Sequence, residues 1–238
     1  MSITQAGAHP GDLAPSTQAP AVRYDAGRAS TWFGLAFPAA QFTVMLAMAI
    51  FVLPHGGAPT DPALERGLSI LDAETTYRMG NYVFMLAGVL LLGFLGAVAQ
   101  RLRAVDASGV LATVGVAAGT LIALIWPMAG MLHDVALSTA AHGTDVRILT
   151  GWDDVAPYSL AFSALPRLFL IGALVLGLRA AGTSTWLPRV GVVIGVLSLA
   201  GNATTLSGAM FPLLALSTLA FDLWLASVAW HWLRHPLR

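Results

Sequence analysis

The chain has 238 residues, of which 57% are hydrophobic and only 10% are charged, whereas a soluble domain normally carries about 25% charged residues. This composition indicates a membrane protein. The twelve basic residues are all Arg and the chain has no Cys. These absences exclude retinal proteins and lysine Schiff-base enzymes, as well as disulfides, thiolate zinc sites and cysteine nucleophiles.

The first thirty residues are rich in Ala, Pro, Gly, Ser and Thr. Such a segment cannot bury enough apolar surface to fold alone, so residues 1–30 are predicted to be a disordered tail. No charged segment is followed at once by a short apolar run and a cleavage site, so a cleaved signal peptide is not expected. Residues 31–238 are predicted to form one transmembrane domain.

Six apolar runs are each close to the twenty residues that a membrane-spanning helix needs. They lack the alternation of apolar and polar residues that barrel strands show, and hydrocarbon admits only helices or closed barrels. The predicted fold class is therefore all-α, a polytopic bundle of six transmembrane helices. We expect the helices over residues 32–53, 80–100, 109–132, 157–179, 187–206 and 211–233.

The Arg residues are distributed unequally between the two sides of such a bundle. Arg66, Arg78 and Arg147 flank the spans on one side, in loops that are otherwise acidic. Basic residues that flank short spans remain cytoplasmic, so both termini are predicted to be cytoplasmic and the location to be a bacterial cytoplasmic membrane. The Arg residues on the side of the termini are Arg23, Arg28, Arg101, Arg103, Arg179, Arg189, Arg234 and Arg238.

Small and aromatic residues add detail to this bundle. Gly115 with Gly119, and Gly191 with Gly195, form two GxxxG spacings that let helices approach closely. The contacts that they permit are expected within the chain, although a homo-oligomer is the alternative. Amphipathic Trp rings prefer the headgroup region. The Trp residues at or near the predicted helix ends are Trp32, Trp152, Trp186, Trp230 and Trp232.

Two charges lie deep inside the spans, Arg167 in the fourth and Asp222 in the sixth. Each follows the predicted outer start of its helix by about ten residues, which places both near mid-membrane. A charge there costs about 2.5–3.5 kcal/mol, so the two are expected to pair. The pair could clamp the helices together. Alternatively it could line a cavity, in which Arg167 binds an anionic or carbonyl group and Asp222 exchanges a proton.

Two further residues inside the spans are candidates for contacting a ligand. Asn202 in the fifth span could do so, although such a side chain more often forms an interhelical hydrogen bond. Trp126 precedes Pro127 in the third span, a pattern typical of a kink with an aromatic ring beside it.

The outer loops hold other candidate groups. Glu74 and Arg78 are four residues apart, the spacing of a helical ion pair, and together with Asp72 they could instead form a charged lid. Zinc or another divalent cation could use four side chains of the second loop, but their spacing matches no standard pattern. We therefore predict neither a metal site nor a cofactor. These four residues are His133, Asp134, His142 and Asp145.

Three segments resemble a bacterial family of small six-span membrane proteins, catalogued as domain of unknown function 4386. They are FLIGALVLGLRAAGTSTWLPRVGVVIGVLSLAGN (169–202), ILDAETTYRMGNYVF (70–84) and LSTLAFDLWLASVAW (216–230). In that family an aromatic-Leu-Pro-Arg-x-x-Gly step joins spans four and five. The resemblance covers about residues 30–233 and implies the six-helix architecture and the cytoplasmic membrane, but no activity.

Three functions remain open at this stage. The first is a non-catalytic membrane protein whose polar pair is structural or lines a cavity for a lipid or small ligand. The second is an intramembrane enzyme on an isoprenoid or other lipid, with Asp222 as general acid and Glu74 or His133 assisting from the outer mouth. The third is a proton-coupled transporter, which would use Arg167 and Asp222 as a relay. No nucleic-acid partner is expected.

Overall fold

The structure is a computed structural model that describes residues 26–52, 61–153, 155–183 and 186–236, and within these ranges its regular structure is entirely helical. Six described helices are long and apolar enough to cross a membrane, which confirms the prediction of an all-α fold with six helices of this kind. The six are α1 (Ala26–Ala47), α3 (Glu74–Val105), α4 (Val110–Ala141), α6 (Val155–Ala180), α7 (Trp186–Gly201) and α8 (Phe211–Arg234). Shorter elements are α2 (Ala63–Asp72), α5 (Ile148–Asp153), the π-helical turn η1 (Met48–Val52) and the 3₁₀ turns η3 (Asn202–Thr205) and η4 (Gly208–Met210).

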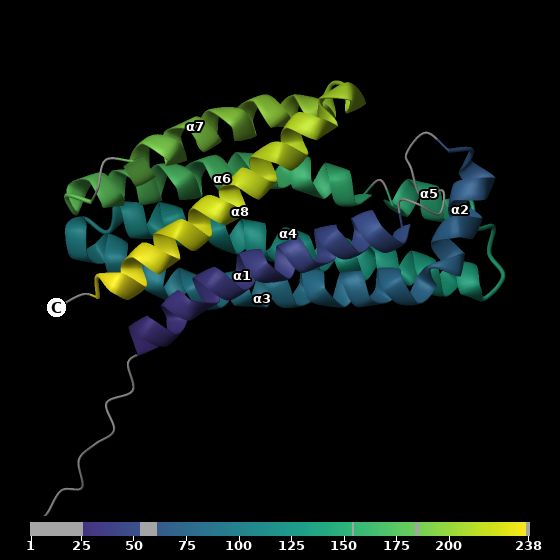
Figure 1. Cartoon of the computed structure of the whole chain (residues 1–238), viewed down its shortest axis with the longest axis horizontal. Helices are drawn as coiled ribbons and strands as arrows, with labels where there is room; N and C mark the ends of the chain where they lie inside the picture. The colour runs from purple at the N-terminus through teal and green to yellow at the C-terminus, as the bar shows by residue number, and fades with distance from the viewer. Residues whose placement is uncertain (1–25, 53–60, 154, 184–185, 237–238) are drawn as a thin grey trace, which may run out of the picture.

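The six long helices form one antiparallel bundle. Each packs against the next long helix along the chain, and α8 returns to pack against α1, so the helices make a closed ring. The start of α1 and the end of α8 lie at the same end of this bundle (Figure 1). The interior is filled by a core that includes Phe37, Phe94, Trp126, Leu170 and Phe221.

The outward faces of the bundle are strongly apolar. Large hydrophobic side chains remain exposed along all six long helices, and a water-soluble monomer rarely exposes contiguous apolar patches of this extent. Hydrocarbon accommodates such a surface without cost, which agrees with a multi-pass membrane protein. Examples are Leu46, Val89, Leu124, Phe162, Phe169, Val193, Val196, Leu216 and Leu223.

Two helices extend well beyond their predicted ends. α3 begins at Glu74 and α4 ends at Ala141, and each has 32 residues. At about 1.5 Å per residue such a helix is about 48 Å long, so it projects beyond a hydrocarbon core of about 30 Å. The short helices α2 and α5, which were not predicted, lie against this projecting end (Figure 1). They enclose a second apolar cluster with Ile70, Tyr77, Leu137 and Leu149.

α1 already begins at Ala26, inside the predicted tail of residues 1–30. The physical reason is a contact of Ser30 with α3. Its Oγ donates a hydrogen bond to the carbonyl oxygen of Gly93 at 2.5 Å and accepts one from the backbone N–H of Ala97 at 2.7 Å. The predicted disorder of residues 1–25 lies outside the described residues.

Both GxxxG spacings face other helices of the same chain. A Cβ added at Gly191 would lie 2.6 Å from atoms of Trp224 and Val175, and one at Gly119 would lie 2.3 Å from Leu95. These glycines therefore serve packing within the chain, and a homo-oligomer through these faces stays a prediction.

Candidate functional site

Arg167 lies inside the bundle, and only 1% of its surface is exposed. Its Nη2 donates a hydrogen bond to Oγ of Ser163 at 2.9 Å, one turn earlier in α6, and its Nη1 donates to Oγ1 of Thr218 in α8 at 3.1 Å. Each hydroxyl in turn donates to a carbonyl of its own helix, that of Leu160 or Leu214. Both hydroxyl groups thus donate within their own helices, and their oxygens accept the hydrogen bonds of the guanidinium.

Phe221 covers the guanidinium from α8. Its ring centroid lies 5.0 Å from Cζ of Arg167, a distance at which the ring face attracts a cation. Phe221 is itself only 1% exposed. The charge of Arg167 is therefore held between two hydroxyls and an aromatic face in the buried interior of the bundle.

Asp222 is equally buried, with 1% of its surface exposed. It follows Thr218 by one helical turn and therefore lies on the same face of α8. Its carboxylate interacts electrostatically with Arg167, but the two side chains form no direct ion pair, and the hydrogen bonds of the guanidinium go to Ser163 and Thr218. The sequence correctly places both charges in the interior, and the direct pairing that it suggests is replaced by hydroxyl contacts.

This arrangement leaves two buried polar atoms without a hydrogen bond in the described structure, Nε of Arg167 and Oδ2 of Asp222. A buried polar atom without a partner costs about 1–3 kcal/mol, and more when it carries charge. One atom is a donor and the other an acceptor. A group that both accepts and donates, such as a hydroxyl or a carboxyl, has the chemistry to satisfy them.

Trp126 and Asn202 differ in their relation to these charges. Trp126 is buried in the same apolar core as Phe221, its ring is stacked on Phe84 at 5.2 Å, and its Nε1 has no hydrogen bond. Asn202 is half-buried in the turn η3 after α7. It makes no hydrogen bond with Arg167 or Asp222.

The other two predicted catalytic residues belong to the projecting end of α3 and α4. Oε1 of Glu74 pairs with Nε of Arg78 at 2.7 Å in the first turns of α3. His133 is buried, its Nδ1 lies 3.1 Å from Nδ2 of Asn81, and its ring lies 4.9 Å from that of Tyr77. Tyr77 belongs to the second apolar cluster, so the structure separates Glu74 and His133 from Asp222.

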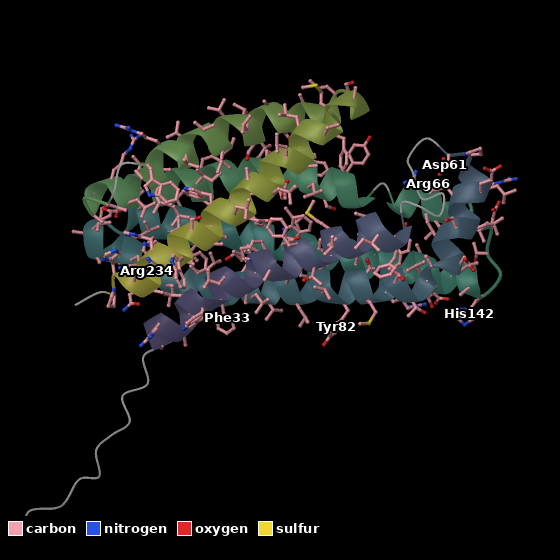
Figure 2. All side chains as sticks on the ribbon, in the orientation of Figure 1. Phe33, Asp61, Arg66, Tyr82, His142 and Arg234 are labelled. Carbon is pink, nitrogen blue, oxygen red and sulfur yellow. The ribbon has the colours of Figure 1, made fainter. Side chains whose placement is uncertain are left out.

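The four possible metal ligands of the outer loop are also dispersed. His142 is exposed at the projecting end of the bundle (Figure 2), with Nδ1 2.6 Å from the carbonyl oxygen of Ser138, whereas Oδ2 of Asp145 lies 3.8 Å from Nη1 of Arg147. Asp134 accepts from Nδ2 of Asn81 at 2.8 Å. Within the part of the chain that the structure describes, no three His, Asp or Glu side chains gather as metal ligands.

Ser163, Thr218 and Asn81 are not among the site residues predicted from the sequence. A signal for the first two exists, because Ser163 precedes Arg167 by four residues and Thr218 precedes Asp222 by four, the spacing that places side chains on one helix face. For Asn81 the signal is a carboxamide at the start of the second apolar run.

Comparison with known proteins gives no identification, since no family model, no curated protein and no solved structure matches the chain.

Proposed function

We propose that this chain is a multi-pass protein of the bacterial cytoplasmic membrane, and that Arg167 and Asp222 bind the polar group of a lipid or small amphipathic ligand within the bundle. The observation that carries the proposal is the pair of unmatched atoms, Nε of Arg167 and Oδ2 of Asp222. A purely structural ion pair would be expected to join these atoms directly, because desolvated charges need each other's hydrogen bonds.

The chemistry of the two atoms limits the ligand. Nε donates and an ionised carboxylate only accepts, so one hydroxyl or carboxyl group can bond to both. The surroundings are apolar, with Phe221 over the guanidinium and Ala161, Ala164 and Leu214 packed between α6 and α8. A long-chain alcohol or fatty acid combines such a polar group with an apolar body.

The ligand is tested with three molecules of equal chain length: hexadecanol, hexadecanoic acid and hexadecane. The purified full chain in detergent should gain thermal stability with hexadecanol or hexadecanoic acid and not with hexadecane. Asp222→Leu should abolish this gain, and an Arg167→Met/Asp222→Leu double variant guards against unfolding caused by an uncompensated charge. Glu74→Gln, which removes a carboxylate at the projecting end, is the matched control and should respond like the wild type.

Equal responses of wild type and Asp222→Leu would overturn the proposal. So would the absence of any response in the wild type, in which case the buried charges act only in folding.

The proposed orientation places both termini in the cytoplasm. Its support is the excess of Arg at the end of the bundle that holds both termini, together with the positive-inside rule. The family resemblance agrees with this orientation without testing it. The family's six-span plan has the same even number of crossings.

The absence of Cys makes the orientation directly testable. Single cysteines at Ala107, in the α3–α4 turn, and at Thr144, after α4, would be exposed at opposite ends of the bundle. A maleimide that cannot cross the cytoplasmic membrane should label Thr144→Cys in intact cells and Ala107→Cys only after lysis. The reverse pattern would overturn the orientation and leave the ligand proposal standing.

A further inference from the structure

The end of the bundle that holds both termini contains two adjoining cavities. The larger, of about 580 Å³, lies between the last turns of α3, α6 and α8, and its polar lining includes Arg101, Thr183, His231 and His235. The smaller, of about 380 Å³, is lined by α1, α3 and α8 and includes Arg28 and Gln100. Arg101 and Trp232 line both cavities.

Arg101 is held in place at the junction of these cavities. Its Nη2 donates a hydrogen bond to the carbonyl oxygen of Trp232 at 2.9 Å, and its guanidinium lies 5.6 Å from the Trp232 ring centroid. Nε and Nη1 make no hydrogen bond with a described residue. The side chain is half-buried. It therefore keeps N–H donors for an anion in the adjoining cavities, and Arg recognises phosphate through such donors.

Two imidazoles also line the larger cavity. The rings of His231 and His235, one turn apart at the end of α8, lie 4.6 Å from each other. Imidazole nitrogens and the hydroxyl of Thr183 can donate hydrogen bonds to phosphate oxygens. Helix C-termini disfavour anions, but here the carbonyls of Leu178 and Arg179 are capped by the backbone N–H groups of Thr183 and Gly182, each at 3.0 Å.

The charge around this end also favours an anion. The described acidic residue here is Asp106, and its carboxylate is already bonded to N–H groups of Ser108 and Leu111. Six Arg side chains lie at the same end, and all of them except Arg101 are exposed. They are Arg28, Arg101, Arg103, Arg179, Arg189 and Arg234.

Exposed Trp side chains indicate that this end of the bundle lies at the level of the lipid headgroups. Trp32, Trp186 and Trp230 project from this end and are about half exposed, as expected of rings in the headgroup region. Trp232, by contrast, is buried at 6% exposure, so it is a wall of the cavities and not the membrane anchor that its position in the sequence predicts. Leu102, Val105 and Leu178 give the larger cavity an apolar side.

We infer that this cavity binds the phosphate group of an anionic phospholipid, with Arg101 as the principal ligand, His231, His235 and Thr183 as further donors, and the glycerol and upper acyl chain against the apolar wall. Basic pockets between transmembrane helices at the cytoplasmic side suit such headgroups. The inference rests on the membrane location proposed above and is independent of the ligand proposed for Arg167 and Asp222.

The test titrates the delipidated full chain in detergent with phosphatidylglycerol, phosphatidylcholine or inorganic phosphate, and follows binding by native mass spectrometry and by the melting temperature. Phosphatidylglycerol should bind and raise the melting temperature, and the other two should do so much less. Arg101→Gln should weaken phosphatidylglycerol binding about tenfold or more, since a hydrogen bond to a charged group is lost. Arg189→Gln, an exposed Arg at the same end that lines neither cavity, should leave it unchanged.

Equal losses of phosphatidylglycerol binding in Arg101→Gln and Arg189→Gln would mean that the lipid is attracted by the basic surface in general. That result would overturn the inference. Inorganic phosphate that binds as tightly as phosphatidylglycerol would overturn the lipid assignment. If Arg101→Gln fails to fold, the His231→Gln/His235→Gln double variant takes its place, and unchanged binding in that variant would contradict the inference. Loss of lipid binding here with an intact response to hexadecanol would separate this site from the proposed one.

Discussion

Nη1 of Arg167 donates a hydrogen bond across the bundle to Oγ1 of Thr218, 3.1 Å away. This contact joins α6 to α8 beside Arg167 and Asp222, the two charges buried inside the long described helices. It also explains why Asp222, one turn further along α8, can remain near the guanidinium without bonding to it. The hydroxyl supplies the acceptor that a carboxylate would otherwise supply.

Removal of this hydroxyl should destabilise the bundle. Thr218→Val keeps the shape of the side chain but leaves Nη1 of Arg167 buried without an acceptor, so we expect a loss of about 1.5–3 kcal/mol in the free energy of unfolding. Thermal or denaturant unfolding in detergent, followed by circular dichroism, measures it. Thr43→Val is the matched control, because Oγ1 of Thr43 is exposed and bonds only to the carbonyl of Ala39 in its own helix. Equal effects of the two substitutions would contradict this role of Thr218.

Close packing of α3 on α4 gives a second prediction. A Cβ at Gly88 would lie 2.4 Å from the backbone oxygen of Ala123 and 2.6 Å from Cγ of Pro127. Backbone and a proline ring cannot move aside cheaply, so Gly88→Ala should lower stability by about 1–3 kcal/mol through overpacking. Gly172→Ala, where a Cβ meets nothing within 4 Å, should be neutral or gain up to about 1 kcal/mol from helix propensity. Unfolding measurements on the two variants test this prediction. A Gly88→Ala protein as stable as the wild type would contradict the close packing at Gly88.

The projecting end depends on Asn81. Its Nδ2 donates to Oδ1 of Asp134 at 2.8 Å and lies 3.1 Å from Nδ1 of His133, so a single carboxamide connects α3 with two residues of α4. Asn81→Ala should therefore cost about 1–3 kcal/mol, since the half-buried Asp134 loses a hydrogen bond and the buried His133 loses a polar neighbour. The effect should appear in amide hydrogen exchange as faster exchange at this end. Asn202→Ala removes a carboxamide that makes no hydrogen bond with a described residue, and it should have little effect.

The sequence predicts the six spans well because hydrocarbon requires each to be a continuous apolar helix of about twenty residues. It does not predict how far α3 and α4 continue, since residues such as Glu74 and Arg78 are compatible with either a loop or a helix. The helices α2 and α5 are not predicted from the sequence for a related reason. They are short, and contacts of Ile70 and Leu149 with the projecting helices hold them in place. No local sequence pattern shows such contacts.

The candidate site is predicted only in part. Burial of Arg167 and Asp222 follows from the cost of exposing a charge to hydrocarbon, and the structure confirms it. Which groups satisfy the guanidinium depends on the rotation of α6 and α8 about their axes, and that rotation is set by packing. Ser163 lies one helical turn before Arg167, but Thr218 is 51 residues away in sequence and could be recognised as a partner of Arg167 only from the fold.

The turn before α4 should make stability depend on pH. Hydrogen bonds from the hydroxyl and N–H of Ser108 and from the N–H of Leu111 to Asp106 hold the pKa of its carboxyl below the ordinary value of 3.8. Because the folded pKa lies below the unfolded one, its stabilising contribution is complete above about pH 4 and is lost as the pH falls through the folded pKa. Asp106→Asn should remove this part of the acid-induced decrease in melting temperature, measured between pH 7 and pH 2. Glu65→Gln, at an exposed carboxylate that accepts no hydrogen bond from a described residue, is the control. Parallel curves for wild type and Asp106→Asn would show that the carboxylate does not stabilise the start of α4.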